Sequence, residues 1–330
     1  MMGRPRPYFR WNGAANLNDR HRLNSNDDIS NPAQKEAIVS HSKKTLRLLM
    51  PQWQGGNNPT YHLGARLLAW LAPESDAEFA EVPVAQPDGS PLPVEDGVVA
   101  KTAILQQNEA ARDIIRKVNP DRIVTFGGDC SVSLAPFSYL ASKYAGDVAV
   151  LWIDSHVDFT TSEFYENAHG YPMRNLLGQG DAEFAAFAEN PIPANRLIYV
   201  GVGKKQMSER SLRDMDAIGA RVFDPSDLTE NFDEVIEALK ATGASKLLVH
   251  FDLDVLDPEH FRAQLFNNPN GLADHFAGMA TGKLTFSNVI NLLSRSGKVI
   301  DIAALSITEH LPWDAENLRQ ALAQLPILSR

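Results

Sequence analysis

The stretch Trp152-Ile153-Asp154-Ser155-His156-Val157-Asp158 decides the fold, because an apolar run ends there and three metal-type side chains begin. The run 148–153 predicts a strand that is buried on both faces. On a continued strand, Asp154 and Asp158 would share a face but lie roughly 13 Å apart, at about 3.3 Å per residue. Two metal ions in one site lie only about 3.5–4 Å apart, so we expect the chain to leave the strand near His156 and curl back. The cluster then lies at a strand's carboxyl end, where open α/β sheets bind ligands.

A second cluster of the same kind occupies residues 250–258, after the apolar strand 247–249. It places Asp252 and Asp254 at i and i+2. Carboxylates at the ends of two buried strands repel each other and lose solvation, so they need cations. Oxygen ligands with one imidazole suit manganese, and other divalent metals remain open. The alternative is a pair of solvated carboxylates that bind no ion.

Composition limits the possible partners of the chain. The 330 residues carry a formal net charge of −10, which argues against nucleic acid or an anionic membrane as the main partner and suits a cationic small molecule. Cys130 is the only cysteine, so no disulfide forms within the chain, as in a reducing cytosol. No apolar run approaches the roughly 18 residues of a membrane span, and no charged-then-apolar leader opens the chain. We therefore expect a soluble, cytoplasmic protein.

The rest of the chain predicts one α/β domain. Residues 1–44 are polar and without periodicity, which indicates a poorly ordered arm, and residues 72–97 are rich in proline and acids, which indicates a surface excursion. From 45 to 330, strands alternate with amphipathic helices, a pattern typical of a parallel sheet covered on both faces. The expected strands are 45–50, 122–126, 148–153, 197–202, 221–223, 247–251 and 304–308, and the expected helices include 60–71, 103–118, 233–241 and 286–294.

Two further strand ends carry polar groups. Gly127-Gly128-Asp129-Cys130-Ser131 predicts a sharp turn in which Asp129 caps the next helix and Cys130 faces the cluster, and Glu309 follows the last strand. Together with H-G-x-P at 169–172 and D-x-D-x-x-D-P at 252–258, these motifs resemble the ureohydrolase family of arginases, agmatinases and related amidinohydrolases. The resemblance covers residues 45–325. It implies a three-layer α-β-α fold with an eight-stranded parallel sheet, assembled as homotrimers or homohexamers.

The resemblance also implies a reaction and a set of site residues. In that family, two Mn²⁺ ions hold a bridging hydroxide that attacks the guanidinium carbon and releases urea and an amine. His169 then resembles the proton shuttle, Glu309 the carboxylate that grips the guanidinium, and Asn167 a further substrate contact. Asp154 and Asp252 would bridge the ions, and Asp158 would share in catalysis. The metal ligands implied are Cys130, Asp154, His156, Asp158, Asp252 and Asp254.

Two departures from the family pattern stand at this centre. Cys130 replaces a histidine ligand, so it is either an inert buried thiol beside a weakened site or a thiolate ligand. A thiolate would lower the charge of the cluster by one unit and favour Zn²⁺ or a single ion. His250 stands where the family commonly has a small residue. It shares a face with Asp252. We expect it to form a hydrogen bond to one of the metal ligands rather than to bind the metal itself.

The expected reaction is hydrolysis of a guanidino or hydroxyguanidino compound, with agmatine-, guanidino-acid- and hydroxyarginine-like substrates as candidates. Lys204 and Lys205 are basic where the family has an acid, and they would either meet a carboxylate on the substrate or face solvent. Two other functions stay open. One is a one-metal, deacetylase-like amidohydrolase that uses Asp154, His156 and another aspartate. The other is a degenerate ureohydrolase kept as a binding or regulatory protein.

Overall fold

The computed structural model describes residues 43–269 and 278–325 of the chain. The chain divides into two compact units, Met1–Ser42 and Lys43–Arg330, and all the described elements belong to the second. The polar arm expected over residues 1–44 therefore lies almost wholly outside the described residues. No described helix is both long and apolar enough to cross a membrane.

Eight strands form one sheet in the order β2-β1-β5-β10-β9-β6-β7-β8, and every neighbouring pair is parallel. This confirms the predicted fold class. A short antiparallel hairpin of β3 (Val94–Glu95) and β4 (Val98–Val99) lies outside it. The bounds are β1 Thr45–Met50, β2 Glu78–Glu81, β5 Arg122–Gly127, β6 Val148–Ile153, β7 Leu197–Val200, β8 Arg221–Phe223, β9 Lys246–Asp252 and β10 Asp301–Thr308.

The strand β2 and the hairpin correct the prediction that residues 72–97 form only a surface excursion. The segment Glu78–Glu81 pairs with β1 at the edge of the sheet, and its side chains are mostly exposed. An edge strand that buries neither face needs no apolar run, so its sequence gives no strand pattern.

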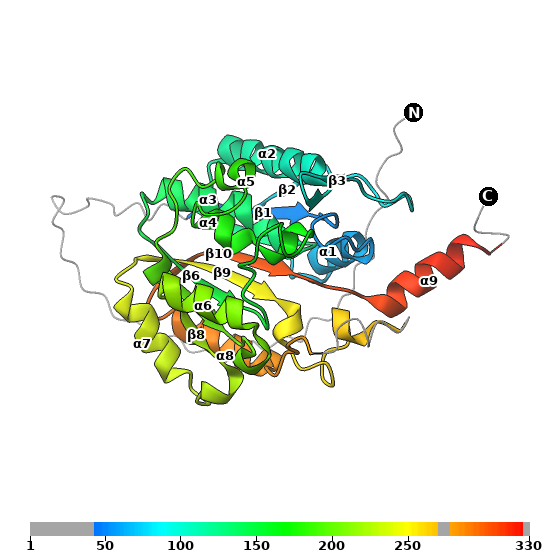
Figure 1. Ribbon diagram of the computed structural model, residues 1–330. Coiled ribbons are helices and arrows are strands. Elements are labelled where there is room, and N and C mark those ends of the chain that lie inside the picture. Colours follow the sequence, from blue (N-terminus) through cyan, green and yellow to red (C-terminus); the bar gives the residue numbers. More distant parts are fainter. Residues whose placement is uncertain (1–42, 270–277, 326–330) are drawn as a thin grey trace, which may run out of the picture. The chain divides into compact units, whose positions relative to one another are not determined.

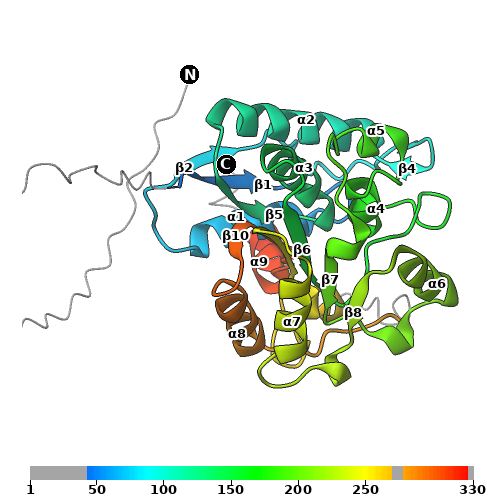
Figure 2. The ribbon, with the colours of Figure 1, turned by 90° about the vertical axis from the view of Figure 1, so that its left-hand side faces the viewer.

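Helices cover both faces of the sheet (Figures 1 and 2). The helices α2, α3, α4 and α5 pack on one face, and α1, α7 and α8 pack on the other. Their bounds are α1 Thr60–Leu71, α2 Lys101–Val118, α3 Leu134–Lys143, α4 Pro172–Leu176, α5 Ala182–Ala185, α7 Asp233–Ala241 and α8 Phe286–Ser296; the chain also forms α6 Glu209–Ile218 and α9 Trp313–Ala323.

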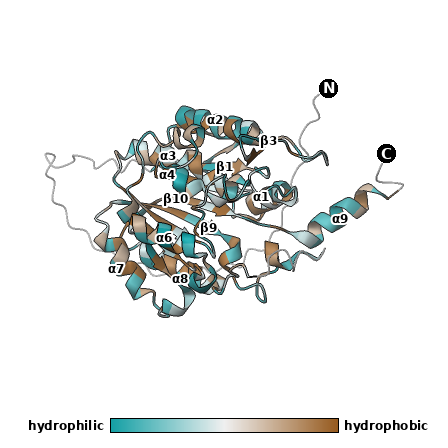
Figure 3. Cartoon of the chain, in the orientation of Figure 1, coloured by the Kyte–Doolittle hydropathy of each residue, from teal (hydrophilic) through white to brown (hydrophobic). Residues whose placement is uncertain are grey.

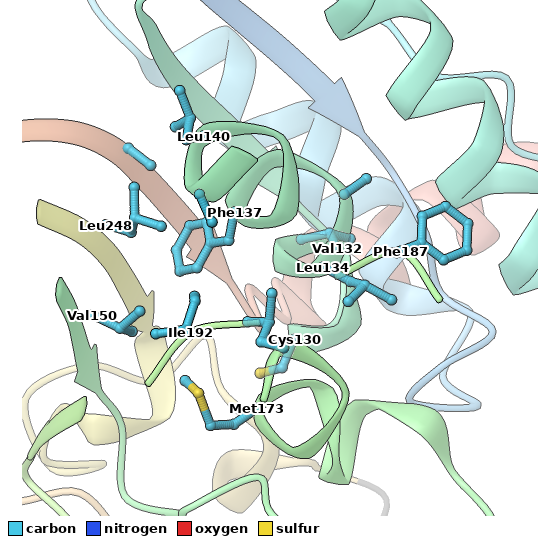
Figure 4. Packing of buried hydrophobic residues seen from close by; sticks show 14 of the residues in the cluster. Cys130, Val132, Leu134, Phe137, Leu140, Val150, Met173, Phe187, Ile192 and Leu248 are labelled. Atoms are coloured by element: carbon cyan, nitrogen blue, oxygen red, sulfur yellow. The ribbon is translucent and has the colours of Figure 1, made fainter. Parts of the chain in front are cut away.

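The central strand β6 is fully buried, and its alternate residues enter two separate cores. Val150 and Trp152 pack with α3 on one side, whereas Leu151 and Ile153 pack with α7 and α8 on the other. Full burial of such a side chain contributes about 1.5–3 kcal/mol. The strands are coloured mainly hydrophobic in Figure 3, and Figure 4 shows Cys130 beside Met173 in the first core. Residues that directly follow β6 are therefore held by a rigid strand.

The four strands that carry polar ends are neighbours in the sheet. Their order is β5-β10-β9-β6, and all run in the same direction. The register pairs Thr308 of β10 with Asp252 of β9, and Phe251 of β9 with Ile153 of β6. The residues that follow these strands consequently meet at one edge of the sheet.

Candidate active site

The turn after β6 begins earlier in the sequence than predicted. The strand ends at Ile153, so the chain leaves it at Asp154 and not near His156. Asp154 Oδ1 accepts a hydrogen bond of 2.7 Å from the backbone N–H of His156, and Trp152 Nε1 donates to Asp154 Oδ2 at 2.9 Å. Asp158 adopts φ 44°, in the left-handed region that non-glycine residues rarely occupy. The predicted curl is confirmed, and it bends Asp158 out of the strand direction.

The end of β9 makes a matching turn and joins the first cluster. Asp252 Oδ1 accepts from the backbone N–H of Asp254 at 2.7 Å and so caps a short 3-10 helix, Leu253–Val255. Asp254 Oδ2 lies 3.1 Å from His156 Nδ1, and Asp254 Oδ1 accepts from Ser155 Oγ at 2.7 Å. The two sequence clusters are thus linked through side chains.

The turn after β5 brings Cys130 to the same place. A Cβ on Gly128 would lie 1.7 Å from the carbonyl oxygen of Gln52, so only glycine fits. Asp129 caps the 3-10 helix Cys130–Ser133 by accepting from Ser131 N–H at 3.1 Å, as predicted. Cys130 Sγ, which is buried, then donates to Asp252 Oδ2 at 2.9 Å. The prediction that Cys130 faces the cluster is confirmed.

The potential ligand atoms form three close groups among the described residues, each with its atoms within 4.8 Å of one another. Every residue that the sequence suggested as a ligand belongs to at least one group, and His250 and Glu309 join them. The groups are Cys130, Asp154, Asp158 and His250; Cys130, Asp252 and Glu309; and Asp154, His156 and Asp254.

These side chains fit divalent cations by their chemistry. Asp158 Oδ2 and His156 Nε2 are buried without a hydrogen-bond partner, although each is a good metal ligand. Burial, followed by the charges of neighbouring aspartates, raises the pKa of Asp154, Asp158 and Asp252. Carboxyl groups that resist ionisation side by side become stable as anions when a cation lies among them.

A second feature, the pair of His169 and Glu309, lies beside this cluster. His169 Nδ1 is 3.1 Å from Glu309 Oε1, and the phenol of Tyr165 lies 2.9 Å from His169 Nε2. Asn167 Nδ2 donates to the Tyr165 oxygen at 3.3 Å. Glu309, only 4 % exposed and at φ 62°, also accepts from the Cys130 N–H at 3.2 Å. Glu309 is therefore no surface charge: it faces the imidazole.

Burial controls the protonation of this pair. It raises the pKa of Glu309 well above its ordinary value and lowers the pKa of His169 to about 4. A carboxyl group that resists ionisation favours a cationic ligand, because the ligand's charge offsets the cost of ionising it. The pair can accept such a ligand and exchange a proton with it.

The cluster and the pair share one cavity of about 900 Å³. Among its described lining residues, the acidic groups are Asp158, Asp252, Asp254 and Glu309, and no lysine or arginine takes part. Neutral side chains such as those of Gln206, Met207, Ser208, Ser211, Tyr165 and Asn167 complete the wall.

The lysines considered from the sequence lie elsewhere. Lys204 Nζ is paired with Asp227 at 2.8 Å, and neither Lys204 nor Lys205 lines the cavity. The idea that they meet a carboxylate on the substrate is therefore wrong for this arrangement. The alternative is that the lysines face solvent, and Lys205 is exposed while Lys204 is partly exposed. Of the short 3-10 helix Lys204–Gln206, only Gln206 lines the cavity.

His250 is buried beside the cluster, but its hydrogen-bond partners are Ser133 and Thr308 and not a suggested metal ligand, which corrects the expectation. Its Nδ1 lies 2.8 Å from Ser133 Oγ and its Nε2 lies 3.2 Å from Thr308 Oγ1, so both nitrogens have partners. Burial lowers its pKa to about 3, which keeps the ring neutral. The roles of Ser133, Thr308 and Tyr165 were not predicted. For Tyr165 the only signal is its place four residues before His169.

Comparisons with known proteins agree with this geometry. The model of the arginase family matches residues 64–290, more than half of the chain. The arginase of Staphylococcus aureus (strain MRSA252) is 27 % identical over 148 residues, which are 41 % of this chain and 46 % of that protein. The chain thus matches less than half of the length of this relative.

Solved structures show the same fold at lower identity. The crystal structure of Entamoeba histolytica arginase in complex with L-ornithine superposes with a TM-score of 0.68 at 19 % identity, over 82 % of this chain and 92 % of that one. Proclavaminate amidino hydrolase from Streptomyces clavuligerus gives 0.58 at 17 % identity, over 82 % and 84 %. With the family match over residues 64–290, the eight-stranded parallel sheet and the clustered ligand groups, this chain belongs to the arginase family.

Proposed function

We propose that this protein hydrolyses the guanidino group of a small cationic substrate to urea and an amine. The observation that carries the proposal is the meeting, in one cavity, of the ligand groups around Asp154 and the His169–Glu309 pair. Ligand groups alone suit ion binding, whereas a neighbouring carboxyl–imidazole pair adds substrate recognition and proton transfer. Membership of the arginase family supports this reaction class.

The metal centre belongs to the proposal. Two divalent ions, Mn²⁺ first and Zn²⁺ as the softer alternative, would be held by Cys130, Asp154, His156, Asp158, Asp252 and Asp254. Cys130 and Asp154 each belong to two of the three groups, whereas Asp252 belongs to one. Such ions lower the pKa of water and so supply a nucleophile near neutral pH. Asp158, whose Oδ2 is buried without a hydrogen-bond partner, would help to orient that water.

The side chains beside the ligands perform the remaining steps. Glu309 binds the guanidinium by charge and hydrogen bonds, because it is a buried carboxyl group that lines the cavity beside His169. His169, neutral near pH 7, would take up a proton from the attacking water and pass it to the leaving amine, since its ring contacts the group that holds the substrate. Asn167, through Tyr165, fixes the ring from its other side.

The cavity wall limits the far end of the substrate. Apart from the acidic groups and the two histidines, the described lining offers hydroxyl, amide, thioether and apolar groups and no lysine or arginine. Neither an α-ammonium nor a carboxylate finds a charged partner there. An agmatine-, guanidino-acid- or hydroxyarginine-like substrate would therefore keep any second charge hydrated, and an uncharged arm fits best.

A substrate panel tests the reaction class. Metal-loaded protein is incubated with agmatine, ω-guanidino acids, hydroxyarginine, arginine and alkylguanidines, beside acetylated amines, and urea and acetate are measured. We expect urea from at least one guanidine, no acetate, and no urea from Glu309→Gln. Release of acetate alone would indicate the one-metal deacetylase-like enzyme. Binding of guanidines without any product would indicate the degenerate, binding protein.

We also propose a homotrimer or homohexamer in the cytoplasm. The helices α1 and α9 contact each other and expose apolar side chains, among them Trp70 at 69 % and Leu318 at 59 %. Light scattering should give three or six times the chain mass of 36.4 kDa, and a monomer would contradict the proposal. The compartment rests on the unpaired Cys130, and imaging of a tagged protein tests it.

A further inference from the structure

We infer that His250 is a positioning residue for Cys130: Ser133, His250 and Thr308 form a hydrogen-bond chain that directs the Thr308 hydroxyl onto the Cys130 sulfur. The inference rests on the proposed function in one respect, which is that Cys130 binds a cation. It goes beyond that function because it assigns a task to three buried residues that touch neither substrate nor solvent.

The chain is continuous and shielded from water. His250 Nδ1 lies 2.8 Å from Ser133 Oγ, His250 Nε2 lies 3.2 Å from Thr308 Oγ1, and Thr308 Oγ1 lies 3.6 Å from Cys130 Sγ. All four residues are at most 2 % exposed. They come from the 3-10 helix Cys130–Ser133, from β9 and from β10. Because no solvent can substitute for a lost partner, each polar group depends on the next.

The ring of His250 has one orientation. It stacks on the indole of Trp152, with centroids 3.5 Å apart and planes within 4°. Trp152 is its register partner on β6 and donates to Asp154 Oδ2. Rotation of the imidazole would lose this stacking and both hydrogen bonds. The indole therefore holds the ring of His250 on one side and a carboxylate ligand on the other.

The directions of the hydrogen bonds follow from counting hydrogens. Cys130 Sγ has one hydrogen, which it donates to Asp252 Oδ2 at 2.9 Å. Toward Thr308 the sulfur can only accept, so the threonine hydroxyl donates and its oxygen accepts from His250 Nε2–H. A neutral imidazole carries one N–H, so Nδ1 accepts from the Ser133 hydroxyl. One tautomer satisfies all three contacts.

The hydrogen bond from Thr308 to the Cys130 sulfur can still form when Cys130 binds a cation. A coordinated thiol has lost its hydrogen, so the sulfur becomes an acceptor only, which suits the donor that Thr308 presents. A thiolate ligand carries a negative charge that a neutral histidine ligand at this position would not carry. The hydrogen bond from the Thr308 hydroxyl draws part of that charge away from the sulfur. Outer partners of metal ligands typically contribute 10–100-fold in metal affinity. The same range is expected for this chain.

Co²⁺ is the probe, because it reports both affinity and the sulfur ligand. Its dissociation constant is measured by chelator competition, and the charge-transfer absorption from sulfur to Co²⁺ is recorded. We expect Thr308→Val to weaken binding about 10- to 100-fold and to move the band to longer wavelength, since the sulfur then keeps more charge. His250→Phe, which keeps a flat ring on Trp152, should behave in the same way.

Thr125 of β5 supplies a matched control. It is 1 % exposed and its hydroxyl has no partner, so Thr125→Val makes the same replacement in the same sheet without touching the chain of hydrogen bonds. Thr125→Val and Thr308→Ser should both retain wild-type affinity and spectrum.

The double variant shows whether His250 and Thr308 act through one chain of hydrogen bonds or affect Co²⁺ binding independently. If His250 acts through Thr308, His250→Phe/Thr308→Val should bind Co²⁺ no more weakly than Thr308→Val alone. Thr308→Val that matches Thr125→Val in affinity and spectrum would overturn the inference. Wild-type protein that binds Co²⁺ without a sulfur band would overturn it together with the Cys130 assignment. Guanidine hydrolysis, measured as urea release, tests the proposed function separately. Its result does not decide the inference about His250. If His250→Phe does not fold, Thr308→Val alone decides.

Discussion

His169 lies between two hydrogen-bond partners, Tyr165 and Glu309. Its burial lowers its pKa, and this determines which role it can have in proton transfer. With the pKa lowered to about 4, the ring is neutral near pH 7 and can carry a proton only when a neighbouring charge favours it. In the proposed reaction, negative charge that develops beside the ring would raise its affinity for a proton. His169 is thus suited to transient proton transfer and not to permanent positive charge.

Replacement of His169 by asparagine should therefore affect turnover more than binding. The amide keeps a hydrogen-bond donor toward Glu309 but cannot deliver a proton, so kcat should fall about 10²- to 10⁴-fold while KM stays within a few-fold. Steady-state urea release with the best substrate of the panel measures both constants. Asn175→Ala, a change at a buried polar residue outside the cavity lining, provides the control. An unchanged kcat in His169→Asn would exclude the shuttle role.

Cys130 decides whether the centre is complete. If it is a ligand, Cys130→Ala should lose one ion per chain and most of the activity, because one ion alone does not supply the same nucleophile. Cys130→His should keep both ions and improve Mn²⁺ occupancy, since it restores an uncharged ligand. Metal content and urea release are measured on the three proteins. Equal metal content and equal rates in wild type and Cys130→Ala would make Cys130 a bystander.

The place of a single residue could be predicted from the sequence when the residue belongs to a short motif beside a recognisable strand. Asp154, His156 and Asp252 stand within a few residues of a recognisable strand end, so spacing alone indicates their place. The partners of His250 could not be found in this way. Ser133 and Thr308 are separated from it by 117 and 58 positions, and only the register of the sheet brings them together.

Among the elements, the turn after β5 is closely packed. Gly128 lies against the Gln52 carbonyl, which itself accepts from the Asp129 N–H at 3.1 Å. This contact sets where the 3-10 helix Cys130–Ser133 begins. Any shift of the turn moves Cys130 away from Asp252.

Gly128→Ala should consequently lower both stability and metal affinity. The added methyl group forces the backbone apart, which costs about 1–3 kcal/mol or more in the free energy of unfolding. Gly297→Ala is the control: Gly297 ends α8 at φ −63°, and a Cβ there meets nothing closer than 3.4 Å. Urea unfolding compares the two variants. Equal stability would show that the turn tolerates a side chain.

The sequence predicts elements well when they are buried. The strands β1 and β6 and the helices α1 and α7 have the predicted bounds, because each carries a clear apolar pattern. The edge strand β8 also has its predicted bounds, although none of its residues is buried. The strand β2 escapes detection because it is exposed, and β7 ends two residues early, at Val200. Pairing at an edge depends on the neighbouring strand more than on the residues themselves.

On the scale of the whole molecule, the buried carboxyl groups make stability depend on pH and on cations. The raised pKa values of Asp154, Asp158 and Asp252 mean that the metal-free folded protein keeps protons that the unfolded chain releases above its ordinary pKa near 4. Their contribution to stability is therefore complete at low pH and is lost as the pH rises through the raised values.

Divalent cations should reverse this trend, because they replace the protons. We expect the melting temperature of metal-free protein to fall as the pH rises through the raised pKa values of these carboxyl groups, and the increase caused by Mn²⁺ to grow as it does so. Calorimetry with and without Mn²⁺ measures both. Asp252→Asn should reduce both slopes. A stabilisation by Mn²⁺ that does not change with pH would mean that the ion binds outside this cluster.

The character of the whole cavity was the least predictable feature. The sequence suggested basic groups at Lys204 and Lys205, whereas the described residues that line the cavity include no lysine or arginine. A cavity is lined by loops from distant parts of the chain, and whether a loop residue faces it depends on a turn of one or two residues.

The most direct test of the central claim is a titration of metal-free protein with Mn²⁺ in which urea release is measured at each addition. A two-ion guanidine hydrolase predicts that activity rises with added metal and reaches its plateau at two ions per chain. A plateau at one ion per chain, or tightly bound Mn²⁺ with no urea from any guanidine, would contradict it.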